Sequence, residues 1–222
     1  MDGNVLFFTD ALTLPSAFSV ATVLFGQPSS TAVATSQFIW DNVTLVNYVG
    51  TQLLGNPSFE SGLLSAGLGV ATGNWGYYVQ TATTVNRVTS PVASGVWAVD
   101  ITVPSTGGAR GGYAFQDVAQ SFIPVDNLVL ELDFDLYRSS GSVQEITVAF
   151  DWDRGMGTVG SQALLRFNAS TIDWSAFGGS GVISHTVSTG VWHHGTIRIG
   201  FNVDLNPPVI ERWSTGFAWS ES

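Results

Sequence analysis

The chain has 222 residues, of which 45% are hydrophobic and 11% are charged, and its formal net charge is −10. All seven basic residues are arginine, which leaves no concentrated basic surface for phosphate groups and excludes nucleic acid as an expected partner. Disulfides and thiolate metal sites are excluded because there is no cysteine, and the length is that of a domain with one large core.

The first 26 residues form two strand-like runs broken by Pro15. Asp2 and Asp10 lie where a signal peptide would be apolar or positively charged, so we expect no ordinary export signal. The apolar run from Ala11 to Gly26 is too short to span a bilayer comfortably, so we expect no membrane segment.

The segment from Phe38 to Gly62 contains two apolar runs joined by a short polar link, which predicts a strand, a turn and a second strand. Side chains alternate along a regular strand, so four of them would share one face: Ile39, Asp41, Val43 and Leu45. The apolar members of that face would point toward a core. Pro57 interrupts the second run, and proline in a sheet belongs at an edge, a strand start or a bulge. We therefore expect this hairpin at the margin of a sheet.

From Tyr77 onward, strand-like runs follow one another with glycine-containing turns between them. Residues 127–137 and 143–153 alternate almost strictly, as half-buried strands do. Helical apolar periodicity is not sustained over three turns anywhere, and residues 170–177 are the one short helix candidate. The pattern predicts an all-β fold with little helix.

Three short motifs carry a family resemblance. Asn56 to Glu60 (NPSFE) resembles the opening strand of jelly-roll carbohydrate-binding modules with a galactose-binding-like fold. Asp41 to Leu45 (DNVTL) resembles their closing strand, and Ser94 to Val99 resembles their second characteristic strand. The resemblance implies an antiparallel β-sandwich of the jelly-roll type over residues 53–219, although here the closing motif precedes the opening one.

The end of the chain is similar to a segment near its start: Thr215–Trp219 (TGFAW) matches Ser36–Trp40 (SQFIW), but no DNVTL strand follows the second copy. A sheet that lacks a strand exposes unpaired backbone groups, which natural proteins avoid. We therefore predict an N-terminal β segment, residues 1–48, and a jelly-roll domain, residues 49–222. The strand from Phe38 to Asn47 would close the sandwich of its own chain or that of a neighbouring copy.

An acidic stripe is the most enzyme-like feature, because Glu131, Asp133 and Asp135 would share one face of a strand. It is similar to the acidic motif of jelly-roll β-glucanases, whose retaining members hold two carboxyl groups ~5–5.5 Å apart. The third acidic residue is aspartate rather than glutamate, and a solvent-facing polar stripe is routine in antiparallel sheets. We expect no catalytic residue, with a glycosidase as an alternative.

Aromatic residues are the better candidates for recognising glycan, because the apolar faces of sugar rings stack on them. Loop context selects four of them: Trp75, Tyr77, Tyr78 and Trp174. Core packing stays open as an alternative for Trp75, and it is the expected role of four strand-like tryptophans: Trp97, Trp152, Trp192 and Trp219.

The resemblance also implies a structural calcium ion near the opening strand, with Asp41, Glu60 and Asp100 as candidate ligands. No dense calcium-binding loop is present, so a buried or capped carboxylate is the alternative role for each. His193 and His194 are adjacent and would point to opposite faces of a strand, so the sequence offers no convincing zinc site. No cofactor is expected beyond that calcium.

These features predict a non-catalytic structural or glycan-recognising protein of a virion, as a tail or decoration component, or of another extracellular assembly. Its expected partners are copies of itself or other structural subunits, and a cell-surface polysaccharide. The alternatives are a carbohydrate-binding module of a polysaccharide-degrading system and a jelly-roll β-glucanase-like glycosidase.

Overall fold

The computed structural model describes residues 4–9, 18–30, 35–47, 49–61, 64–66, 74–80, 82–105, 110–122, 128–140, 146–152, 162–167, 171–176, 179–184, 187–201 and 213–221. The strands in these ranges are β1 (Asn4–Thr9), β2 (Phe18–Ser30), β3 (Ser36–Asn47), β4 (Ser65–Ala66), β5 (Gly76–Val79), β6 (Thr84–Val88), β7 (Ala98–Val103), β8 (Arg110–Phe122), β9 (Leu128–Ser140), β10 (Ile146–Trp152), β11 (Gln162–Phe167), β12 (Thr171–Ala176), β13 (Gly179–Ser184), β14 (Trp192–Phe201) and β15 (Trp213–Glu221). These ranges contain no helix, and therefore none that could cross a membrane. The predicted all-β character is confirmed, and the short helix candidate at residues 170–177 is wrong over residues 171–176, where β12 pairs with β11 and β13.

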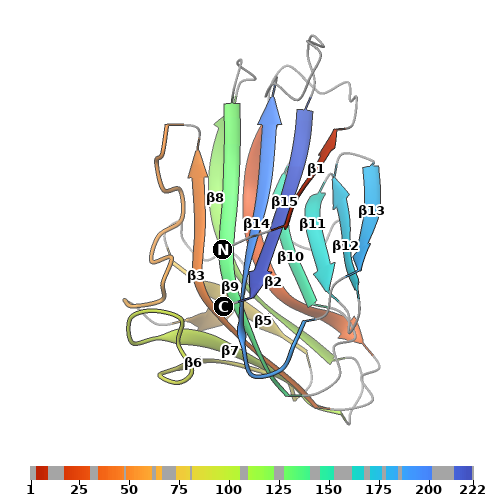
Figure 1. The fold of residues 1–222 in the computed structure, drawn as a ribbon. Helices are drawn as coiled ribbons and strands as arrows, with labels where there is room; N and C mark the ends of the chain where they lie inside the picture. The colour runs from red at the N-terminus through yellow and green to blue at the C-terminus, as the bar shows by residue number, and fades with distance from the viewer. Residues whose placement is uncertain are drawn as a thin grey trace.

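The strands form two sheets (Figure 1). One has seven strands in the order β1-β15-β14-β9-β3-β7-β6, and the other has eight in the order β13-β12-β11-β10-β2-β8-β5-β4. Among the described strands, β4 and β5 form the one parallel pair, and every other ladder is antiparallel. Figure 1 shows β3, β9, β14 and β15 of the first sheet in front of β2, β8 and β10 of the second.

Side chains from both sheets meet in one apolar core. The ring of Phe25 on β2 lies 4.8 Å from that of Trp40 on β3, measured between centroids, and 5.4 Å from that of Trp75. On β9 the predicted alternation is confirmed, because one set of side chains is fully buried: Leu130, Leu132, Phe134 and Leu136. Burying each large apolar side chain stabilises the fold by about 1.5–3 kcal/mol, so the β9 face is a main contributor to this core.

A β-bulge interrupts β3. Its pairing with β9 runs from Asp41 opposite Asp135 to Thr44 opposite Asp133, so two residues of β3 face a single residue of β9. Asn42 lies at this point in the left-handed conformation, with φ at 48°. Asparagine tolerates that conformation better than most residues, which suits it to the extra position.

The bulge reverses which side chains face the core. Phe38 and Trp40 belong to the core cluster before it, and Val43 and Leu45 belong to it afterwards. A single extra residue shifts the two-residue period of a strand by one position, so the faces exchange. The prediction of one continuous face through Asp41 and Val43 is therefore wrong.

The surroundings of β3 also differ from the expected hairpin. The strand lies between β9 and β7 in the middle of its sheet, not at the margin. Gln52 forms only an isolated bridge with Val46, and the NPSFE segment makes turns, with positive φ at Asn56 and Phe59, instead of a strand. The Pro57 carbonyl accepts a hydrogen bond of 2.9 Å from the Val43 amide, so this turn supports the bulge.

The two ends of the described chain pair with each other. Asn4 of β1 lies opposite Trp219 of β15, and the ladder continues to Thr9 opposite Ser214. The strand beside β15 is thus β1, while β3 is paired on both sides within its own chain. The division at residue 48 stays a prediction.

Candidate functional site

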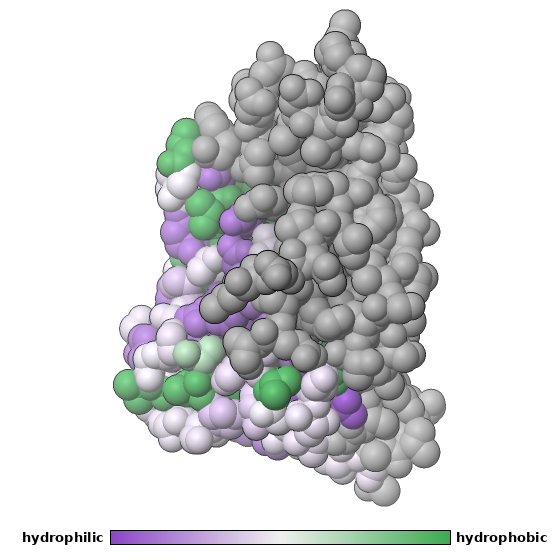
Figure 2. All heavy atoms as spheres, viewed as in Figure 1, coloured by the Kyte–Doolittle hydropathy of each residue, from purple (hydrophilic) through white to green (hydrophobic). Residues whose placement is uncertain are grey.

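One face of the seven-stranded sheet carries a row of polar and aromatic side chains. On β9, Asp133, Asp135 and Tyr137 point away from the core positions, and the register of β14 sets one residue beside each of them. We call these six residues the outer-face row: Asp133, Asp135 and Tyr137 of β9, with Thr196, His194 and Trp192 of β14. Figure 2 shows hydrophilic residues gathered over the central described part of the surface that faces the viewer, with apolar patches toward its upper left and lower edge.

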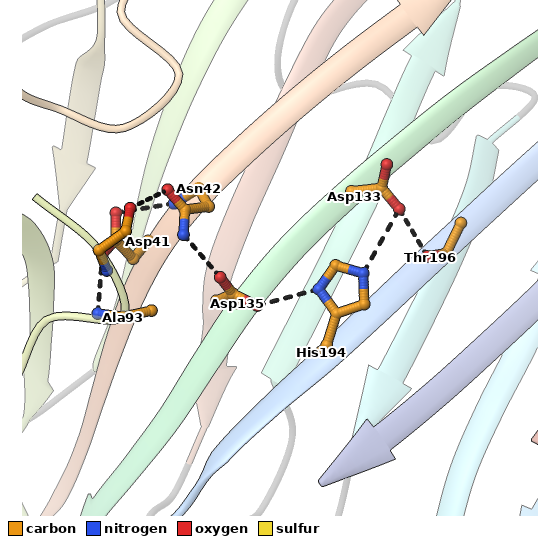
Figure 3. A network of polar contacts seen from close by, with 8 residues as sticks. Asp41, Asn42, Ala93, Asp133, Asp135, His194 and Thr196 are labelled. Atoms are coloured by element: carbon orange, nitrogen blue, oxygen red, sulfur yellow. Dashed lines mark hydrogen bonds and ion pairs between the residues drawn. The ribbon is translucent and has the colours of Figure 1, made fainter. Parts of the chain in front are cut away.

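His194 lies between two carboxylates (Figure 3). Its Nδ1 is 2.9 Å from Oδ1 of Asp135, and its Nε2 is 3.7 Å from Oδ1 of Asp133. The His194 side chain is 49% exposed, so a solute can reach the imidazole although the two carboxylates are more enclosed. Thr196 Oγ1 donates a hydrogen bond of 2.5 Å to the same oxygen of Asp133.

This arrangement shifts the acidity of two members of the row. The hydrogen bond to Asp135 raises the pKa of His194, and the negative charges of Asp135, Asp133 and Glu131 add to it, while burial acts in the opposite direction. Burial raises the pKa of Asp133, and its hydrogen bond from Thr196 offsets part of that effect. The neighbouring Glu131 raises the pKa of Asp133 further by charge repulsion.

The network continues from Asp135 to the β3 bulge. Asn42 Nδ2 donates a hydrogen bond of 2.7 Å to Oδ2 of Asp135, and Ser94 Oγ donates one of 2.8 Å to Oδ1 of Asn42. The extra residue of the bulge therefore turns its amide toward the outer-face row and fixes the carboxylate of Asp135 from the β3 side (Figure 3).

Tyr137 and Trp192 form an aromatic pair at one end of the row. Their ring centroids are 5.3 Å apart, and both side chains are partly exposed. The core role expected for Trp192 is wrong, because this residue lies outside the core cluster. The sequence does show that Trp192 and His194 share one face of a strand and that Tyr137 continues the alternation of the acidic stripe. It does not show the register that places the two strands side by side.

Of the four aromatic residues selected from the sequence, the structure describes the side chains of Trp75, Tyr77 and Tyr78, and these differ in exposure. Trp75 is 2% exposed, and its Nε1 donates a hydrogen bond of 2.8 Å to the Asn56 carbonyl, so its ring presents no open face to a ligand. Tyr77 is partly buried against the core, whereas Tyr78 is 42% exposed on β5. The backbone of Trp174 lies in β12, and its side chain is outside the described residues.

Asp41 and Glu60, two of the candidate calcium ligands, hold one loop by accepting hydrogen bonds from its backbone. Oδ2 of the buried Asp41 accepts from the amides of Ala93 and Ser94 at 2.9 and 3.0 Å. Oε1 of the exposed Glu60 accepts from the amides at positions 96 and 97 at 2.9 and 3.1 Å, and these bonds lower the pKa of Glu60. Burial raises the pKa of Asp41, although its backbone hydrogen bonds oppose that shift. The geometry gives both residues the capped-carboxylate role.

Asp100, the third candidate, lies apart on β7. It is 7% exposed and accepts a hydrogen bond from Thr102 Oγ1, and burial raises its pKa. Within the described ranges, no group of three or more histidine, aspartate or glutamate side chains is arranged to hold a metal ion. Each of the three candidates accepts protein hydrogen bonds, and its role as a calcium ligand stays a prediction.

Chemically, the outer-face row combines a pair of aromatic rings tilted by 53° to each other, carboxylate acceptors and one accessible imidazole. Such a surface can stack on the apolar face of a ring while it accepts hydrogen bonds from hydroxyl groups. The residues come from neighbouring strands of one sheet, which fixes their spacing. Comparison of the chain with protein-family models, curated proteins and solved structures finds no match, so the function is inferred from this geometry.

Proposed function

We propose that this chain is a non-catalytic jelly-roll β-sandwich that recognises glycan through the outer face of its seven-stranded sheet. It would act as a structural component of a virion or of another extracellular assembly. The observation that carries the proposal is the partly exposed Tyr137–Trp192 pair beside the carboxylates that flank His194.

Sugar rings suit this surface for two physical reasons. Their C–H faces are apolar and stack on tyrosine and tryptophan, and their hydroxyl groups donate hydrogen bonds to carboxylates. Hydrogen bonds to charged groups contribute about 1.5–3 kcal/mol each, so a few of them suffice beside one stacking contact. Asp135 is already fixed by His194 and Asn42, which lowers the entropy cost of presenting it to a ligand.

The position of the imidazole supports a non-catalytic role. In a retaining glycosidase the bond to be cleaved lies between two carboxyl groups ~5–5.5 Å apart. Here the ring of His194 extends from Asp135 to Asp133 and occupies the space between them (Figure 3).

A glycosidase is kept as the second candidate because of one observation. Burial raises the pKa of Asp133, as a general acid for glycoside cleavage requires. Incubating the protein with cello-, laminari- and mannohexaose and measuring new reducing ends separates the two functions. Hydrolysis that is lost in D133N would replace the binding proposal by the catalytic one.

Calorimetry with the same three hexasaccharides tests the binding site, and it does not depend on tryptophan fluorescence, which W192A would alter. We expect Y137A and W192A each to weaken binding by about tenfold or more, equivalent to ~1.4 kcal/mol. Y78A is the matched control, because it removes an exposed aromatic ring from the other sheet. If Y78A abolishes binding while Y137A does not, the site lies at β5 and the outer-face row is the wrong surface.

The biological setting is tested by the neighbouring genes. Capsid and tail genes beside this one would support the virion component, and genes for polysaccharide-degrading enzymes would support a carbohydrate-binding module of such a system.

A further inference from the structure

The imidazole of His194 has a carboxylate at each of its nitrogens. Nδ1 faces Asp135 at 2.9 Å, and Nε2 faces Asp133 at 3.7 Å. Both nitrogens carry hydrogen only in the imidazolium form, so only that form attracts both carboxylates at once.

The charged groups around His194 come mainly from β9. Glu131, Asp133 and Asp135 lie on that strand and all favour the imidazolium. On β15 the register partner of His194 is Ser220, and on β14 itself Arg198 occupies the position opposite Glu131.

Loss of one proton changes the two contacts differently. The 2.9 Å contact keeps the remaining hydrogen on Nδ1, where it donates to Asp135. Nε2 then carries a lone pair that faces the Asp133 carboxylate, so an attraction becomes a repulsion. The proton passes to solvent, which reaches the half-exposed ring directly.

We propose that protonation of His194 closes the outer-face row to glycan and that its deprotonation opens the row. This inference rests on the proposed function and adds its regulation. In the closed state the imidazolium ties Asp133 to Asp135. In the open state Asp133 is released from that tie, and Nε2 becomes an acceptor for a sugar hydroxyl.

We call this dependence on the protonation of His194 the gate, and it predicts how the affinity for glycan changes with pH. If only the neutral imidazole form binds, the apparent Kd is the intrinsic value divided by the neutral fraction, so it rises by about tenfold for each pH unit below the His194 transition. Above the transition the Kd is constant. The raised pKa of His194 puts this transition above the ordinary histidine value of 6.5.

The test is calorimetric titration of the intact protein with cello-, laminari- and mannohexaose at a series of pH values and constant ionic strength. In parallel, the imidazole signals of the three histidines are followed by NMR, and H194Q assigns the relevant one. We expect the Kd of wild type to fall as pH rises through the His194 transition and then to level off. H194Q, whose side chain does not titrate, and D133N, which removes the second carboxylate, should bind with little pH dependence. H185Q removes another histidine of the chain, and any change that it shares with H194Q would not be specific to the His194 contacts.

The possible outcomes distinguish a failure of the gate from a failure of glycan recognition itself. A wild-type Kd that stays constant through the His194 transition, or that rises with pH, overturns the gate and leaves glycan recognition intact. An unchanged pH slope in both H194Q and D133N overturns it as well. If none of the three hexasaccharides binds at any pH, the proposed function is overturned, and regulation of glycan binding falls with it.

Discussion

Replacing Asp41 by alanine should destabilise the protein strongly, because one buried carboxylate accepts three backbone hydrogen bonds. Its Oδ1 accepts from the Asn42 amide at 2.8 Å, and its Oδ2 accepts from Ala93 and Ser94 at 2.9 and 3.0 Å. A hydrogen bond to a charged group contributes about 1.5–3 kcal/mol, and water that reaches the exposed residues Ala93 and Ser94 will recover part of that loss. We therefore expect D41A to lower the free energy of unfolding by about 3–5 kcal/mol.

The Asp41→Asn variant refines this expectation. An amide keeps one acceptor oxygen but turns an NH₂ group toward amides that need an acceptor, so we expect about half the loss of D41A. Urea unfolding followed by near-ultraviolet circular dichroism gives both values, and an unchanged dependence on urea shows that the unfolded states are comparable. In thermal unfolding each kcal/mol should appear as about 2–4 °C for a chain of this size.

Glu60 provides the matched comparison. It holds the same loop through two backbone amides but is exposed, so water replaces it readily and E60A should cost clearly less than D41A. Equal losses in the two variants would mean that burial is not the reason for the effect. A D41A protein within about 0.5 kcal/mol of wild type, the usual range of a neutral surface substitution, would refute the reasoning altogether.

Two further predictions concern pH and packing. The pKa is raised above the unfolded value of 3.8 for three enclosed carboxyl groups and above 6.5 for one imidazole: Asp41, Asp100, Asp133 and His194. Each such group contributes stability that is fully present below its unfolded pKa and is lost as pH rises through the folded value. The free energy of unfolding should therefore fall as pH rises above about 4, with a second fall above pH 6.5 that H194Q removes. Glu60, whose pKa is lowered from 4.5, opposes the first fall only below that pH. A stability maximum at neutral pH would contradict this sign. Gly195→Ala should lower the free energy of unfolding by about 1–3 kcal/mol, because the added methyl group would lie 2.3 Å from the Phe134 ring. In urea unfolding, the double variant G195A/F134L should recover part of that loss. If the losses of the two single variants simply add in the double variant, the clash is not the cause.

The parts of the fold that follow from strand periodicity could be predicted from the sequence. On β9 the pattern from Leu130 to Leu136 specifies a buried face and an outward face, because a strand alternates every second residue without interruption there. The same periodicity placed the acidic stripe on the outward side.

The bulge could not be predicted in this way. An extra residue at Asn42 leaves no mark in apolar periodicity, yet it exchanges the faces of everything that follows in β3. The turn at Pro57 lies outside the β3–β9 ladder, and it supports the bulge by accepting a hydrogen bond from the Val43 amide. Propensity alone therefore gives a strand where tertiary contacts make a turn.

The candidate site was missed for a related reason. Trp192 and Tyr137 are 55 residues apart, and only the register of β14 on β9 brings their rings together. Trp75 shows the converse, because its glycine-rich neighbourhood indicates a loop while its indole is buried in the core beside Phe25 and Phe59. Local sequence reports the conformation of a segment better than it reports what covers it.

The pairing of β1 with β15 has a mechanical consequence. Because Asn4 lies opposite Trp219 in an antiparallel ladder, a force that pulls these two residues apart loads this pair before the other pairs of the β1–β15 ladder. The hydrogen bonds then break one after another, as in a zipper, and the peak force stays low. A force that enters at one end and leaves through the middle of the sheet would instead load whole strands in shear, along several hydrogen bonds at once. The point of attachment, more than the total stability, would decide how much tension this domain bears.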